Sequence, residues 1–259
     1  MAAQGIILHR VNAPRTIRSG VFIAGTDTGI GKSVVSAALL AALNAGGHRA
    51  IGMKPIASGC RETARGLRNE DAELLIAHGA GVPDYAQVNP FALPEAIAPH
   101  LAAKHAGVEI LLDPIVAAFA ALSTNYDFVV VEGAGGWMVP LSDSLTQSGL
   151  PRALDLPTIL VVGLKLGCLN HAQLSARAII DDGCDLIGWI GNCVDPHMDC
   201  VEENLATLRE RLPVPCLGVL PYANAPDPRA LAPHLHAAAD AVTAARQAIS
   251  HGSPGMGVC

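Results

Sequence analysis

Charged residues are scarce in this sequence: Asp, Glu, Lys and Arg make up 15% of its 259 residues, whereas hydrophobic residues make up 51%. This balance suits a chain whose central β-sheet is buried on both faces. Basic residues are not in excess, since the net charge is −6, so no general attraction to nucleic acid is expected. The longest apolar run, near residues 158–164, is far shorter than the roughly 20 residues of a membrane-spanning helix. We therefore expect neither nucleic acid nor a membrane as a partner.

The cysteines show no disulfide or metal pattern. There are seven of them, an odd number, and no two form a Cys-x-x-Cys pair. Such a set is typical of reduced thiols in a cytoplasmic protein, which is the location we expect. We expect most of them to serve as small buried apolar residues.

The chain shows no internal repeat and no break in composition, so a single domain is expected over residues 19–250. Residues 1–18 carry Arg10, Arg15 and Arg18 but no acid. Because serine is scarce there and helical amphipathicity is poor, we expect a flexible N-terminal extension rather than a transit peptide. Residues 251–259, with three glycines and a proline, are expected to form a flexible tail.

Strand-sized apolar runs alternate with helical segments along the domain. Strands are expected at 21–24, 50–53, 128–131, 158–162, 186–191 and 216–220. Helices are expected at 34–40, 115–122, 170–181 and 201–212, with Asp113 as N-cap and Pro114 in the first turn of the second. The alternation predicts an α/β fold with a doubly wound, mainly parallel sheet and helices on both faces. Ligands in such folds bind beyond the carboxyl ends of the strands.

A glycine-rich loop joins the first predicted strand to the first helix. It reads Gly-Thr-Asp-Thr-Gly-Ile-Gly-Lys-Ser at residues 25–33. In a P-loop, backbone N–H groups and the helix N-terminus face the phosphates, here with Lys32 reaching the β/γ oxygens and Ser33 facing Mg²⁺. Gly25 lies one residue further from Gly31 than in the usual Gly-x4-Gly-Lys-Ser/Thr string, which indicates a variant class of P-loop.

Two further polar residues follow predicted strands. Glu132 comes directly after 128–131 and opens a glycine cluster at 133–136, a place where P-loop proteins hold Mg²⁺. Lys54 ends the second strand, where a cation could stabilise charge on a transferring phosphoryl group. Each has a plain alternative, since Glu132 could be an acidic bystander and Lys54 a solvated lysine. Their common position at one sheet edge with Lys32 favours the functional interpretation.

An acidic cluster at the start of another helical segment offers one more metal ligand. Glu70, Asp71 and Glu73 all lie there, and spacing does not choose between them. Asp71 could also act only as a helix cap.

Several strings occur in order along the chain beside the P-loop. They are Lys-Pro-Ile-Ala-Ser-Gly (54–59), Val-Glu-Gly-Ala-Gly-Gly-Trp (131–137), Pro-Leu-Ser-Asp (140–143), Val-Val-Gly-Leu-Lys-Leu-Gly-Cys-Leu-Asn-His-Ala (161–172) and Gly-Trp-Ile-Gly-Asn (188–192). Together, over residues 21–222, the sequence resembles dethiobiotin synthetase of biotin synthesis, a P-loop NTPase-type family. The resemblance implies ring closure of 7,8-diaminononanoate with CO₂ and ATP, through a carbamate and a carbamic–phosphoric anhydride, with Mg²⁺ as cofactor. No nucleophilic side chain is needed, and no Ser/His/Asp arrangement is apparent.

The resemblance also implies roles for individual residues. Catalytic roles fall to Lys54, Lys32 and Thr28, and metal binding to Ser33, Asp71 and Glu132, so that the family pattern selects Asp71 over its neighbours. The nucleotide-binding set is Gly29, Ile30, Gly31, Lys32, Ser33, Val34, Asp71, Glu132, Gly133, Ala134, Gly135, Asn192, Cys193, Pro221, Tyr222 and Ala223. The substrate-binding set is Ser58, Gly135, Gly167, Cys168, Leu169 and Asn170. The last four would come from the other subunit of a homodimer, whose helix N-terminus at Asn170 suits a carboxylate.

Some features of the sequence leave alternatives open. The 167–170 turn could be a plain helix cap. Asn192-Cys193-Val194-Asp195 superficially resembles a guanine-reading motif without its lysine, so ATP is favoured but other nucleotides stay open. Gly149-Leu150-Pro151 falls where the family forms a short helix, so we expect residues 143–157 to be ordered differently.

Two other classes of protein share this nucleotide core. An amidotransferase synthetase of cobalamin assembly would need an additional glutaminase domain, for which the chain has no room. A ParA/MinD-like regulatory ATPase usually has a second lysine where this chain has Asp27. It would also hydrolyse ATP slowly, with stimulation by DNA or lipid and without any diamine.

Overall fold

The structure is a computed structural model that describes residues 20–250, and the side chains only as far as 246. The predicted extension at 1–18 and the predicted tail at 251–259 both lie outside the described residues. In the described part, no helix is both long and apolar enough to cross a membrane.

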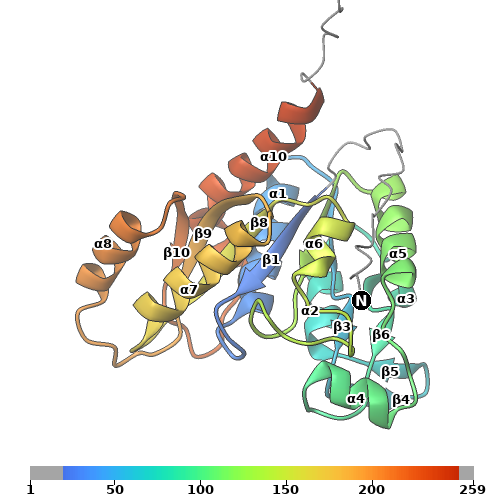
Figure 1. Ribbon diagram of the computed structural model, residues 1–259. Helices are drawn as coiled ribbons and strands as arrows, with labels where there is room; N and C mark the ends of the chain where they lie inside the picture. Colours follow the sequence, from blue (N-terminus) through green and yellow to red (C-terminus); the bar gives the residue numbers. More distant parts are fainter. Residues whose placement is uncertain (1–19, 251–259) are drawn as a thin grey trace, which may run out of the picture.

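Six strands form one parallel sheet in the order β10–β9–β8–β1–β7–β2 (Figure 1). They are β1 (Gly20–Gly25), β2 (Ala50–Met53), β7 (Phe128–Glu132), β8 (Thr158–Leu164), β9 (Leu186–Cys193) and β10 (Cys216–Leu220). The predicted doubly wound parallel sheet is therefore confirmed. Because β1 lies between β7 and β8, the loop after β1 leaves the sheet near the middle of its ligand-binding edge.

Helices cover both faces of the sheet, each over its own apolar cluster. One face packs against α1 (Lys32–Ala45), α2 (Glu70–His78), α9 (Pro228–Leu231), the 3₁₀ helix η1 (Ala232–Leu235) and α10 (His236–Ser250). The other packs against α4 (Pro99–His105), α5 (Leu112–Asn125), α6 (Gly149–Ala153), α7 (Cys168–Asp181) and α8 (Val201–Arg211). In Figure 1, α7 lies in front of the sheet, and α1 and α10 lie behind it. Except for the half-buried edge strand β10, the strands are buried on both sides, as the low charge content of the sequence indicates.

A small subdomain between β2 and α5 was not predicted. It contains β3 (Ile56–Ala57) paired in parallel with β6 (Phe91–Ala92), a hairpin of β4 (Arg61–Thr63) and β5 (Gly66–Arg68), and the short helix α3 (Tyr85–Val88). These strands have only two or three residues each, too few to show a period in the sequence. They place the start of α2 and the residues before α4 beside the P-loop.

Three local predictions were wrong. Asp113 is not an N-cap: α5 begins at Leu112 and has Leu111 before it, so Asp113 and Pro114 both lie in the first turn, where proline needs no N–H partner. The segment 143–157 does form the family's short helix, α6, because Pro151 likewise falls in its first turn. Of the six described cysteines, all free thiols, only Cys60 and Cys168 are buried; the others are half-buried or exposed.

Candidate active site

The P-loop turns sharply between β1 and α1 and is tied to two neighbouring strands. Gly29 and Gly31 both have positive φ, 72° and 78°, which favours glycine at each position. The Thr26 N–H donates to the carbonyl of Val161 in β8 at 3.1 Å. The amide of Asn192, in β9, donates to the carbonyl of Ile30 at 2.8 Å. The loop is therefore held in shape by contacts that do not use its N–H groups near the helix start.

Lys54 is the centre of a buried ion-pair cluster at the end of β2. Its Nζ lies 2.6 Å from Oε1 of Glu132 and 3.1 Å from Oδ2 of Asp71, and it donates to the Gly133 carbonyl at 3.3 Å. Burial works to lower the pKa of Lys54, but attraction to Glu132 and Asp71 outweighs it and the pKa is raised. Lys54 is thus a charged ammonium in a nearly solvent-free position, and the plain alternative of a solvated lysine is wrong.

Three oxygen-bearing side chains converge beside that ammonium. The Ser33 hydroxyl donates to Glu132 Oε1 at 2.9 Å, and Glu132 Oε2 is buried without a hydrogen-bond partner in the described structure. Burial works to raise the pKa of Asp71, but attraction to the Lys54 ammonium outweighs it and the pKa is lowered. Glu132 is the last residue of β7, and Asp71 lies in the first turn of α2, whose cap is the Asn69 side chain. Asp71 is therefore not the cap of this helix.

This donor set fits a hard divalent cation. Two carboxylates, one with a free buried oxygen, and a hydroxyl are the oxygen ligands that such ions prefer. The described residues contain no group of three or more His, Cys, Asp or Glu side chains suited to a metal. The side chains of Ser33, Asp71 and Glu132 would supply part of a coordination sphere, which phosphate and water oxygens usually complete at such sites.

Lys32 lies at the start of α1 and turns back over the P-loop. Its Nζ donates to the carbonyl of Asp27 at 2.7 Å, and the residue is 6% exposed. Burial, followed by repulsion from Lys54, lowers the pKa of Lys32 to about 8. Lys32 is therefore a cation near the balance between its charged and neutral forms, which an incoming anion would shift towards the charged form.

A cleft of about 1080 Å³ opens beside these groups. It brings together most of the site residues predicted from the sequence: Thr28, Gly29, Gly31, Lys32, Ser33, Val34, Lys54, Ser58, Asp71, Glu132, Ala134 and Gly135. Its far wall comes from residues 96–100, before and in α4, and includes His100. The Ser58 hydroxyl and His100 Nδ1 are buried without hydrogen-bond partners in the described structure, so both are available to a ligand.

A smaller hollow of about 220 Å³ lies on the other side of the P-loop. It is lined by five further residues of the predicted nucleotide-binding set, namely Asn192, Cys193, Pro221, Tyr222 and Ala223. Gly29, Gly31 and Val34 line both spaces, so the P-loop lies between them.

The predicted carboxylate-binding turn lies apart from the cleft. Gly167, Cys168, Leu169 and Asn170 are not among the residues that line it. Gly167 has a φ of 93° and is the residue before α7, which begins at Cys168, two residues earlier than predicted. Cys168 is buried, whereas Gly167 and Asn170 are exposed. Within one chain, then, the structure does not bring this turn to the other site residues.

Two supporting contacts of the site were missed by sequence reasoning. Gln147 is fully buried, donates to the Gly136 carbonyl at 2.9 Å and accepts the Ala134 N–H, so it holds the glycine cluster at 133–136 in place. Lys165 lies 3.1 Å from Asp27. Nothing near Gln147 in the sequence indicates its role, whereas Lys165 could have been found by its position directly after β8.

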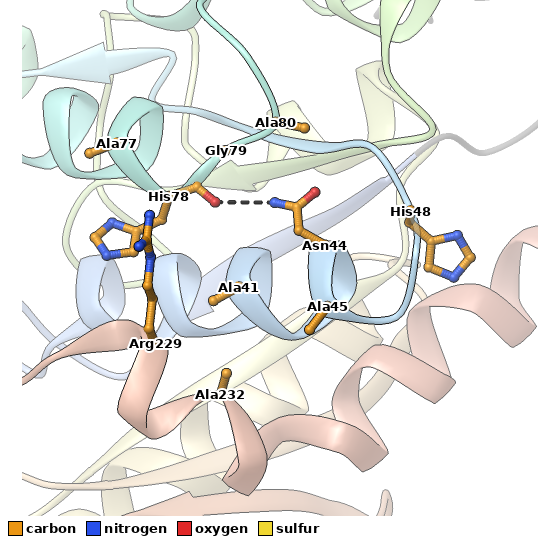
Figure 2. Close-up of a pocket in the computed structure, with 10 residues that line it drawn as sticks. All are labelled: Ala41, Asn44, Ala45, His48, Ala77, His78, Gly79, Ala80, Arg229 and Ala232. Carbon is orange, nitrogen blue, oxygen red and sulfur yellow. Dashed lines mark hydrogen bonds between the residues drawn. The ribbon is translucent and has the colours of Figure 1, made fainter.

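A separate groove of about 520 Å³ lies near the other end of α1, between that helix, the end of α2 and the α9–η1 segment (Figure 2). Figure 2 shows the Asn44 side chain pointing to the carbonyl of His78, to which it donates at 3.1 Å. Asn44 also accepts the Ala50 N–H at 2.8 Å. Its polar atoms are thus used to join α1, α2 and β2, and the groove lies away from the strand ends where ligands bind.

Comparison with known proteins identifies the family. A family model described as an AAA domain matches residues 19–230. An ATP-dependent dethiobiotin synthetase BioD of Xanthomonas euvesicatoria pv. vesicatoria is 56% identical over 211 residues, 82% of this chain and 94% of the relative. The corresponding protein of Xylella fastidiosa is 53% identical over 223 residues, 86% of this chain and 99% of the relative. This chain belongs to the dethiobiotin synthetase family. The predicted resemblance is confirmed, and with it the prediction of an enzyme.

Two solved structures share the fold of this chain. The cell division protein FtsY of Thermotoga maritima has a TM-score of 0.50 at 18% identity, covering 87% of this chain and 72% of FtsY. A ParA family ATPase of Chlorobium tepidum has a TM-score of 0.50 at 13% identity, covering 85% of this chain and 91% of the ATPase. At these identities the likeness extends to the fold alone. This chain thus shares its fold with a ParA family ATPase, a member of the class considered as an alternative.

Proposed function

We propose that this protein closes the ring of dethiobiotin from 7,8-diaminononanoate, CO₂ and ATP, releasing ADP and phosphate. One amine takes up CO₂ as a carbamate, and a carbamate oxygen attacks the γ-phosphorus as ADP leaves. The second amine then attacks the carbonyl carbon of the mixed anhydride, phosphate leaves, and the cyclic urea forms. The observation that carries the proposal is the convergence of Lys32, Lys54 and a set of oxygen ligands on one cleft, in a chain of this family.

Two lysines supply the positive charge that this chemistry needs. Lys32 would bind the β/γ-phosphate oxygens and Lys54 the carbamate and the transferring phosphoryl group, where negative charge concentrates. Thr28 and Ser58 would donate hydrogen bonds to the same groups; the Ser58 hydroxyl has no protein partner that would have to be given up. Catalysis then consists of positioning the reactants and neutralising charge, without a nucleophilic side chain.

Ser33, Asp71 and Glu132 would hold Mg²⁺. When bound, this ion neutralises charge on the phosphate oxygens. The free Oε2 of Glu132 supports the assignment. Lys54 contacts the carboxylates of both Asp71 and Glu132. Its ammonium would therefore lie beside the bound ion, and so beside the transferring phosphoryl group.

ATP would lie across the P-loop, with its phosphates over Gly29–Val34 and its base in the smaller hollow. Asn192 and the 221–223 segment line that hollow, which supports placing the adenine base there. Gly133, Ala134 and Gly135 would approach the nucleotide and the diamine through their backbone. We expect the reaction to take place in the cytoplasm.

A homodimer would complete the substrate site. The 167–170 turn is exposed and lies outside the cleft of its own chain, so a role with the diamine carboxylate requires a second subunit. Large apolar side chains on and beside α7 support an interface here, since Leu166 is 96%, Leu174 61% and Ile180 45% exposed. The N–H groups at the start of α7 would then meet the carboxylate.

The first experiment is a product assay with purified protein, diaminononanoate, bicarbonate, Mg²⁺ and ATP, following dethiobiotin by mass spectrometry and ADP in parallel. Dethiobiotin matched one-for-one by ADP is the expected result. ADP without dethiobiotin, stimulated by DNA or lipid, would instead support the ParA/MinD-like ATPase. Folded protein that makes neither product would overturn the proposal.

A further inference from the structure

Asp27 is an acidic residue inside a loop built to receive phosphates. Its Oδ1 accepts the Thr28 N–H at 2.7 Å, and its carbonyl accepts the ammonium of Lys32 at 2.7 Å. The residue therefore orders the first half of the P-loop and holds Lys32 in its turned-back position. Its carboxylate nonetheless places a negative charge two residues before Gly29, where it would repel a triphosphate.

Lys165 offsets that charge from a different part of the chain. Its Nζ lies 3.1 Å from Asp27 Oδ2, and the two residues are 138 positions apart in the sequence. The hydrogen bond from Thr28, and then that from Lys165, lowers the pKa of Asp27, so the carboxylate is ionised at neutral pH. The contact depends on the sheet, because β8, which ends at Leu164, is hydrogen-bonded to β1, which ends at Gly25.

Lys165 also begins the turn that leads into α7. Its carbonyl accepts the Cys168 N–H at 3.0 Å, which closes the turn around Gly167. The Lys165 side chain thus reaches the nucleotide loop while its backbone shapes the turn at 167–170. Side chains of both partners are partly exposed, 39% for Lys165 and 45% for Asp27, so the pair lies at the protein surface rather than in the core.

We propose that Lys165 is a positioning residue that neutralises Asp27 and thereby allows the P-loop to bind a polyphosphate. The inference rests on the proposed nucleotide role of this loop. Asp27 keeps its structural task, capping Thr28 and holding Lys32, only because Lys165 removes the electrostatic penalty.

The test is a double-mutant cycle on nucleotide affinity, measured by calorimetry with Mg·ADP and with the non-hydrolysable β,γ-imido analogue of Mg·ATP. K165M should weaken binding of the analogue by about tenfold, because Asp27 is left uncompensated. D27N should bind it about threefold more tightly than the natural chain, since asparagine still accepts the Thr28 N–H while Lys165 becomes free. The double variant D27N/K165M should return to within about twofold of the natural chain.

Other measurements separate charge compensation from simple tethering. The K165M defect should shrink as ionic strength rises, because salt screens partly exposed charges, and K165R should restore binding. R246M is a matched control: it removes a surface pair with Asp127 of similar exposure at the opposite end of the sheet, and its affinity should equal that of the natural chain.

The proposal is overturned if the double variant binds as weakly as K165M, because the pair would then serve only as a tether. It is equally overturned if D27N alone loses affinity tenfold, a result that can be obtained even when K165M does not fold. The affinities of the double variant and of D27N are both measured as binding constants, so neither depends on whether dethiobiotin is formed.

Discussion

The ammonium of Lys54 lies 2.6 Å from Oε1 of Glu132, although the two residues are 78 positions apart in the chain. Lys54 is 5% exposed and Glu132 1%, so neither charge is solvated by bulk water. A buried pair of this kind is strongly disturbed when one partner is removed, because the other charge is left without compensation. Replacing either residue should therefore change both the stability of the fold and the activity of the site.

Lys54→Ala should lower turnover by about 100-fold or more while leaving nucleotide affinity largely intact. The variant should also be less stable by about 3 kcal/mol, because Glu132 loses its buried partner. Steady-state kinetics, calorimetry and urea unfolding measure the three effects. Lys104→Ala, at an exposed position of α4, is the matched control and should behave like the natural chain. Near-normal turnover of Lys54→Ala would remove this residue from the mechanism.

Asp71→Asn should raise the Mg²⁺ concentration for half-maximal activity by about tenfold. The substitution should leave α2 intact, because Asn69 makes the cap, accepting the N–H of Asp71 at 3.0 Å. Glu73→Gln tests the neighbouring acid, which pairs with Arg61 at 2.7 Å and should not alter the metal titration. If both variants gave the same titration curve as the natural chain, Asp71 would not be a ligand.

The pH dependence of kcat/KM for ATP should show Lys32. Its pKa of about 8 lies below that of an ordinary lysine, so the free enzyme loses the phosphate-binding ammonium as the pH rises through about 8. The expected profile falls above that pH with a slope of one proton. Lys32→Arg, which stays charged, should have lower activity but no such fall. A profile unchanged between the two proteins would assign the titration to another group.

Gly31→Ala should abolish nucleotide binding. A Cβ at this position would lie 2.2 Å from Nδ2 of Asn192 and would also adopt a φ of 78°. Gly47→Ala is the matched control, since Gly47 has a φ of 87° but no atom within 4 Å of the added carbon. It should cost about 1–2 kcal/mol of stability through backbone strain alone and leave binding unchanged. Intact binding by Gly31→Ala would mean that Asn192 can move away.

Mixed dimers should recover activity if the sites are shared between subunits. Lys54→Ala and Asn170→Glu should each be inactive, the second because its carboxylate repels that of the substrate. When equal amounts of the two variants are refolded together, random pairing makes about half of the dimers mixed. Each mixed dimer has one intact site out of two, so the mixture should show about a quarter of the natural activity. Complementation assays with each variant alone as control decide this. Absence of any recovery would favour a site complete within one chain.

Local patterns were enough to predict several of the residues that line the candidate site. The spacing of Gly29, Gly31 and Lys32 after an apolar run indicates a P-loop, because the turn requires positive φ and the lysine must face the phosphates. Lys54 and Glu132 could be found because both stand at the ends of strands, and parallel strands present those ends at one edge. The choice of Asp71 over Glu70 and Glu73 depended on family resemblance rather than on spacing.

The sequence by itself determined the six strands of the central sheet, the P-loop and the family, since these depend on residues close together or on strings that occur in order. The tertiary structure alone decided which distant side chains meet. Lys165 reaches Asp27 because β8 lies beside β1, and Lys54 reaches Glu132 because β2 lies beside β7. Strand order follows from the packing of whole helices and strands, not from any local period. The position of Lys165 after a strand could therefore indicate a site residue, but only the structure shows that its partner is Asp27.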